Sequence, residues 1–117
     1  MKNTAEKIKQ IALSGGIFKA IPYAMWEQVP ATVKQKEDID EPVQYRASGE
    51  IPAEWLLCQL GLTGFSIGSA KLSEENANML ASGESVDIDH LVQLISLVKM
   101  RIRNAVGILL VENEPLF

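Results

Sequence analysis

A short serine motif is the first feature of the sequence with a known chemistry. Residues 64–68 read Gly-Phe-Ser-Ile-Gly, the G-x-S-x-G pattern of a nucleophile elbow, in which a strained turn exposes the serine. The single histidine, His90, follows with Asp87 and Asp89 beside it, so a serine, aspartate and histidine occur in the chain order of a hydrolase triad. That elbow needs a multistranded sheet, which 117 residues with this pattern do not provide. A hydrolase that uses Ser66 is therefore only a remote alternative.

Cys58 is the other potential nucleophile, and a hydrolase that uses Cys58 belongs to the same remote alternative. It lies among Leu56, Leu57 and Leu60, where we expect a structural, unreactive thiol. A lone cysteine forms no internal disulfide, which suits a cytoplasmic protein. One cysteine and one histidine also argue against a zinc site, and the phosphate-loop pattern is absent. We predict no catalytic residue, no metal site and no cofactor.

Basic side chains form the next candidate site. Lys99, Arg101 and Arg103 interrupt the apolar stretch HLVQLISLVKMRIRNAVGILLV at residues 90–111. They either pair with internal acids or, together with Arg46, bind an anionic ligand, a role that suits the planar guanidinium of arginine. The acids that we expect as internal partners are Glu37, Asp38, Asp40, Glu41, Glu74 and Glu75.

The stretch with these cations reads as one long helix. Asp87 or Asp89 can cap its start, which predicts a helix over about 88–112. The uncharged run from Leu91 to Val98 is too short to cross a membrane, and central cations are costly there. We therefore predict no membrane span.

The apolar residues of this helix repeat every three and four positions. This spacing is typical of a seam between packed helices, and the wide apolar face suits either the centre of a bundle or contact with a second copy of the chain. The residues that we assign to a partner or oligomer interface are Leu91, Ile95, Val98, Ile102, Ala105 and Leu109.

Other segments carry weaker signals. Gly61, Gly64 and Gly68 would line one helix face and allow close packing of a second helix, or else they mark a break in the chain. Ser73 can cap a helix that ends at Gly83, and residues 42–48 alternate like a strand. Between residues 17 and 48, Pro22 and Pro30 allow only short pieces, helical or extended.

Together these elements predict a mainly α fold: a small helical bundle with a long C-terminal helix and one short β-strand or hairpin within 17–48. We expect a single domain over 1–117, with a mixed N-terminal segment (1–48), which starts with a short amphipathic helix, and a helical core (49–117).

The sequence predicts a non-enzymatic function. The chain has a net charge of −4, which disfavours nucleic acid as a partner. We predict a small cytoplasmic regulator or inhibitor that binds another protein and forms a homodimer through its last helix. The alternative is a helical bundle that binds or sequesters an anionic small ligand.

Overall fold

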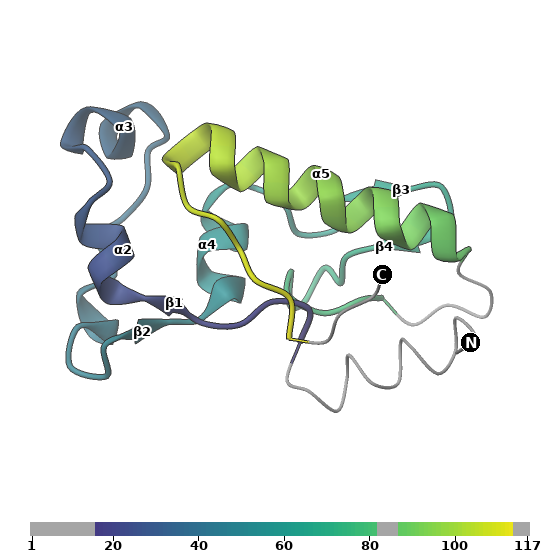
Figure 1. Ribbon diagram of the computed structural model, residues 1–117, viewed down its shortest axis with the longest axis horizontal. Helices are drawn as coiled ribbons and strands as arrows, with labels where there is room; N and C mark the ends of the chain where they lie inside the picture. The colour runs from purple at the N-terminus through teal and green to yellow at the C-terminus, as the bar shows by residue number, and fades with distance from the viewer. Residues whose placement is uncertain (1–15, 82–86, 114–117) are drawn as a thin grey trace.

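The longest element is α5 (Ile88–Val106), which runs from the side of β3 and β4 towards α3 (Figure 1). The computed structural model describes residues 16–81 and 87–113. As predicted, Asp87 caps α5: its carboxylate accepts the N–H of Asp89 at 2.8 Å. The helix ends at Val106, earlier than predicted, because Gly107 adopts a left-handed conformation with φ +78° and closes it.

The remaining elements are short. In chain order they are β1 (Ile21–Pro22), α2 (Tyr23–Glu27), α3 (Ala31–Lys36), the 3-10 helix η1 (Val43–Tyr45), β2 (Glu50–Ile51), α4 (Ala53–Gln59), β3 (Ser66–Ile67) and β4 (Ala70–Lys71). β1 pairs antiparallel with β2, and β3 pairs antiparallel with β4, so the described residues contain two separate two-stranded sheets.

The fold is therefore α+β, and the prediction of a mainly helical bundle is wrong. A strand does occur within 17–48, but its partner β2 lies beyond residue 48. Residues 42–48 form η1 and a turn, not a strand. Strands of two residues are too short to show the two-residue period that identifies a strand in a sequence.

Residues 73–81 also differ from the prediction. The Ser73 hydroxyl accepts the N–H groups of Glu75 and Asn76, as a helix cap would. No helix follows it: the Ser73 N–H donates to the Met79 carbonyl at 2.8 Å, which closes a loop. Gly83 and the helix predicted near the N-terminus lie outside the described residues.

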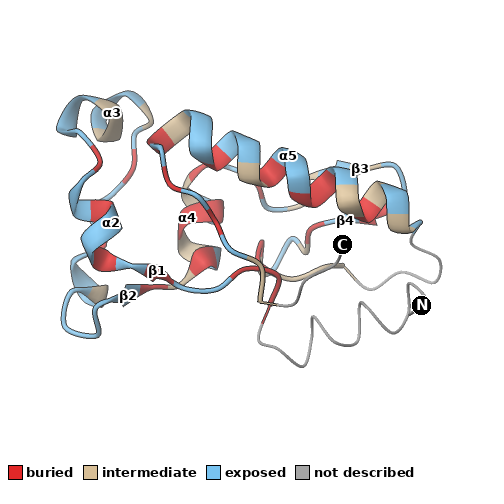
Figure 2. Ribbon diagram, viewed as in Figure 1, coloured by how far each residue is buried: buried red, intermediate tan, exposed pale blue. Residues whose placement is uncertain are grey.

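One face of α5 forms the centre of the core (Figure 2). Leu91, Leu94, Ile95, Val98 and Ile102 are fully buried there. The hairpin of β3 and β4 packs along this helix, and α3 contacts it as well. Leu56 and Leu57 of α4 and Trp26 of α2 complete the core. The wide apolar face that the sequence shows is thus covered by the chain itself.

The two ends of the described chain lie side by side (Figure 1). Phe18 forms an antiparallel bridge with Glu112. The Lys19 N–H donates to the Val111 carbonyl at 2.8 Å, and the Asn113 N–H donates to the Ile17 carbonyl at 2.9 Å. In the described parts of the chain, no helix has the length and apolarity needed to cross a membrane.

Candidate functional site

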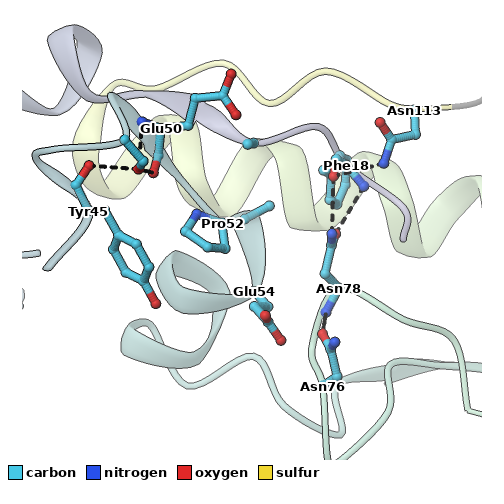
Figure 3. A pocket seen from close by; sticks show the side chains of 11 residues that line it. Phe18, Tyr45, Glu50, Pro52, Glu54, Asn76, Asn78 and Asn113 are labelled. Carbon is cyan, nitrogen blue, oxygen red and sulfur yellow. Dashed lines mark hydrogen bonds between the residues drawn. The ribbon is translucent and has the colours of Figure 1, made fainter. Parts of the chain in front are cut away.

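A hollow of about 390 Å³ opens where the start of the described chain, the 45–54 segment and the 76–78 loop meet (Figure 3). Neutral hydrogen-bonding groups and two acids line it. These side chains are Tyr45, Ser48, Glu50, Glu54, Asn76, Asn78 and Asn113.

Asn78 builds one wall of this hollow and is 7% exposed. Its Oδ1 accepts the Phe18 N–H at 2.9 Å, and its Nδ2 donates to the Phe18 carbonyl at 3.0 Å. Asn76 holds the loop in turn, since its Oδ1 accepts the Asn78 N–H at 2.8 Å. Both hydrogen-bonding ends of the Asn78 amide are therefore used to hold the strand at Phe18.

Asn113 meets the same strand from the C-terminal side. Its Nδ2 donates to the carbonyls of Gly16 and Phe18, both at 3.1 Å. A Cβ at Gly16 would lie 2.5 Å from Asn78 Nδ2, so only glycine fits between these amides. The close approach holds the segments at residues 16–18, 76–78 and 113 together around the hollow.

Several polar groups of the hollow have no partner among the described residues, and three of them stand out. In residues 16–81 and 87–113, no hydrogen bond or ion pair uses the Tyr45 hydroxyl, the Glu54 carboxylate or the Asn76 Nδ2. Tyr45 is held by an edge-on contact with Trp55, at 6.4 Å between ring centroids. One hydroxyl, one carboxylate and one amide donor can bind the hydroxyl and amide groups of a polar ligand.

No sequence pattern identified these residues as a candidate site. Asn76, Asn78 and Asn113 come from separate loops, and asparagine is common in turns for local reasons. Their convergence depends on the bridge between the chain ends, which no local pattern predicts.

Ser66 and His90 do not form a catalytic pair, because His90 contacts Ser69 instead. Ser66 is exposed on β3, whereas His90 Nδ1 lies 2.9 Å from Ser69 Oγ and accepts the Ser69 N–H at 3.0 Å. Ser69 Oγ also accepts the Asp87 N–H at 2.8 Å. These contacts tie the β3–β4 turn to the start of α5 and supply no carboxylate that orients the imidazole.

Cys58 is exposed, contrary to the expectation that its leucine neighbours would bury it. α4 buries the opposite face, with Ala53, Leu56 and Leu57. Within the described ranges, no group of three or more histidine, cysteine, aspartate or glutamate side chains could hold a metal ion.

The four basic candidates do not form one cluster. Lys99 pairs with Glu112 at 3.2 Å and shares a hollow of about 450 Å³ with Arg103. Arg101 lines a different hollow. Arg46 lies over the Tyr23 ring at 5.8 Å, and its pKa is raised, chiefly by hydrogen bonding to the Tyr23 side chain.

The acids predicted as partners of these cations bind elsewhere. Glu41 pairs with Lys34 at 3.5 Å, and Glu74 pairs with Lys71 at 3.3 Å. The acid that does meet Lys99, Glu112, was not among those predicted, because it reaches α5 only through the bridge between the chain ends. Anion binding by Lys99 and Arg103 stays a prediction.

Most of the predicted oligomer interface lies inside the molecule. Leu91, Ile95, Val98 and Ile102 are fully buried within one chain, and only Leu109, at 58%, is well exposed. Ala105 is half-buried against the core. The four buried residues therefore cannot meet a partner without unfolding, and the homo-oligomer itself stays a prediction.

The three glycines lie in turns and not on a helix, so the helix face is wrong, and the alternative of a break in the chain agrees with the structure. Gly61, Gly64 and Gly68 all have positive φ, at +74°, +74° and +56°. Gly68 does approach a helix closely: a Cβ there would lie 2.5 Å from His90 Nδ1 on α5. It is the first residue of the two-residue β3–β4 turn, where glycine is favoured.

Fold and hollow together define a small α+β domain with a neutral and acidic cavity suited to a polar ligand. The family described as UDP-N-acetylenolpyruvoylglucosamine reductase, C-terminal domain, matches residues 7–117. The chain belongs to this family.

Two curated relatives carry the same enzyme name. The UDP-N-acetylenolpyruvoylglucosamine reductase of Anoxybacillus flavithermus is 29% identical over 92 residues, which cover 70% of this chain and 30% of the relative. That of Acaryochloris marina is 26% identical over 105 residues, which cover 81% of this chain and 34% of the relative. The chain thus spans about a third of the length of these relatives.

The family overturns the functional predictions. A non-enzymatic regulator or inhibitor, an anion-sequestering bundle and a hydrolase that uses Ser66 or Cys58 are all wrong, because the family is a domain of a reductase. The prediction of a non-enzymatic protein rested on the absence of hydrolase, phosphate-loop and zinc motifs, and the family match depends on none of these.

Proposed function

We propose that this chain is the substrate-side domain of a reductase that acts on UDP-N-acetylenolpyruvoylglucosamine or a closely related nucleotide sugar. The observation that carries the proposal is the family match over residues 7–117 together with the hollow around Asn76. A reduction also needs an electron donor, and in this proposal a separate domain holds that donor, since the relatives are about three times as long as the matched region.

The hollow suits part of such a substrate. The Tyr45 hydroxyl, the Glu54 carboxylate and the Asn76 amide are without partners in the described chain and can bind sugar hydroxyls and amides. The substrate's anionic groups need cations, and the described residues that line this hollow include none. We infer that the cations come from the donor-holding domain.

Titration of the ¹⁵N-labelled full chain with UDP-N-acetylenolpyruvoylglucosamine tests this proposal. We expect the backbone amide signals of Tyr45, Ser48 and Asn76 to shift on binding. Tyr45→Phe should weaken binding about tenfold, because it removes only a hydroxyl that has no partner in the described chain and so one hydrogen bond to the ligand. Asn104→Ala, an exposed change on α5 away from the hollow, is the matched control. Equal affinities in the two variants, or no shift around the hollow at saturation, would contradict the proposal.

A cytoplasmic location remains part of the proposal. Its support is the unpaired, exposed Cys58, because free thiols persist in reducing compartments.

A further inference from the structure

Two further hollows flank the outer side of α5, the side that faces solvent (Figure 2). The first, of about 440 Å³, lies between α5 and residues 60–65, and the second, of about 450 Å³, lies between α5 and Leu109. Met100 and Asn104 line both hollows and therefore form a ridge between them. We call this ridge with its two hollows the outer face of α5.

Exposed apolar side chains gather on the outer face of α5. The described chain has six large apolar side chains that are well exposed, and three of them, Leu97, Met100 and Leu109, line these hollows. Phe65, which is half-buried, adds its ring to the first hollow. Single apolar side chains scattered over a surface are ordinary, whereas apolar side chains gathered around hollows offer contact area to a partner.

Each hollow also carries one arginine without an acidic partner. Arg101 lines the first hollow and Arg103 lines the second, and both are exposed. In residues 16–81 and 87–113 no ion pair uses either arginine. Lys99 lines the second hollow too, but its pair with Glu112 offsets its charge. Among the described lining residues neither hollow has an aspartate or glutamate, so each combines apolar walls with one available guanidinium group.

The charges indicate which class of partner fits the outer face of α5. A second copy related by a two-fold axis near Met100 would set the cations of both copies against one another. The net charge of −4 opposes approach to an anionic membrane or a nucleic acid, and three cations fall short of the clusters of about 4–8 that bind anionic lipid. A guanidinium group does bind a carboxylate in a planar two-point contact, which favours an acidic polypeptide.

We propose that the outer face of α5 docks an acidic segment of another protein, which crosses the helix at Met100. The segment places one apolar side chain in each hollow, and a carboxylate beside each apolar side chain pairs with Arg101 on one flank and with Arg103 on the other. This inference does not depend on the proposed function, because the outer face of α5 shares no lining residue with the hollow around Asn76.

A random peptide library displayed on phage and panned against the immobilised full chain tests the inference. We expect the enriched peptides to be acidic and to carry two apolar anchors, each with a carboxylate next to it. A synthetic peptide of this set, added to the ¹⁵N-labelled full chain, should shift the amide signals of Leu97, Met100 and Asn104. Its binding should weaken as the salt concentration rises, because exposed charge pairs are screened.

Charge-removing variants locate the contact. Arg101→Gln and Arg103→Gln, both exposed changes that spare the core, should each weaken peptide binding about fivefold. The double variant should weaken it about twenty-five-fold, because the two hollows are separate and their effects add. Lys36→Gln, which removes an exposed positive charge from α3 outside both hollows, is the matched control and should bind as the wild type does.

Several outcomes would overturn the inference. They are the enrichment of no peptide or of neutral peptides, signal shifts confined to another surface, and wild-type affinity in both arginine variants. Vesicles of phosphatidylglycerol should leave the signals of Leu97, Met100 and Asn104 unchanged, and a shift there would assign the outer face of α5 to a membrane instead. A shift of the same signals with protein concentration alone would assign it to a second copy.

Discussion

Asn78 joins two segments that are 60 residues apart in the chain. Its amide meets both the N–H and the carbonyl of Phe18, and its own carbonyl accepts the Ile17 N–H at 2.8 Å. The side chain thus replaces the main-chain pairing that a neighbouring strand would supply. The hollow lies beside this strand edge, whose hydrogen bonds the Asn78 side chain satisfies.

At this scale we predict a large effect of Asn78→Ala. The change leaves the buried N–H of Phe18 without a partner and removes one of two donors to its carbonyl, which should cost about 2–4 kcal/mol of the free energy of unfolding. Urea unfolding followed by circular dichroism measures it. Asn104→Ala, on the exposed side of α5, should change stability by less than about 0.5 kcal/mol. A small loss in Asn78→Ala would mean that water replaces the amide.

The β3–β4 hairpin is the element that the structure holds most closely against α5. Gly68 starts its turn with φ +56°, and the ring of His90 occupies the space where a Cβ would lie. The Ser69 N–H and hydroxyl both meet His90 Nδ1, so turn and helix are fitted to each other.

Gly68→Ala and Gly61→Ala should therefore differ although both glycines have positive φ. Gly61 has no heavy atom within 4 Å of a built Cβ, so alanine there should cost only the backbone strain, about 1 kcal/mol. Alanine at Gly68 adds a clash with the His90 ring and should cost about 1–3 kcal/mol more. Thermal unfolding of both variants gives the difference. Equal losses would show that the hairpin can move away from α5 without cost.

Some features of these helices and turns could be predicted from the sequence, and others could not. The start of α5 and its buried face were readable because capping and a three- and four-residue period are local signals, as at Asp87 and Ile95. The positive φ of Gly61, Gly64 and Gly68 leaves no such local signal in the sequence, so the spacing of these glycines was compatible with a helix although they lie in turns. The hollow needs Asn78 and Asn113 both to bond to Phe18, which lies 60 and 95 residues away from them, and no short window of sequence contains that information.

At the scale of the whole molecule, α5 belongs to the core of a single chain. We predict that Ile102→Ala costs about 2–5 kcal/mol, as for large cavities in a core. Leu109→Ala, at the exposed end of the same predicted seam, should cost less than about 0.5 kcal/mol. Urea unfolding at two protein concentrations measures both. Equal costs, with a midpoint that rises with protein concentration, would instead show that the seam pairs with a second copy.

The bridge between residues 17–19 and 111–113 has a consequence for how the protein is made. Asn113 and Gly16 are 97 positions apart, so this contact spans the described chain and raises the contact order of the fold. During synthesis the segment with Ile17 and Phe18 leaves the ribosome early and must wait, with its apolar side chains uncovered, until residue 113 has emerged. A product that stops short of residue 110 would never cover them, and it should aggregate where the full chain stays in solution.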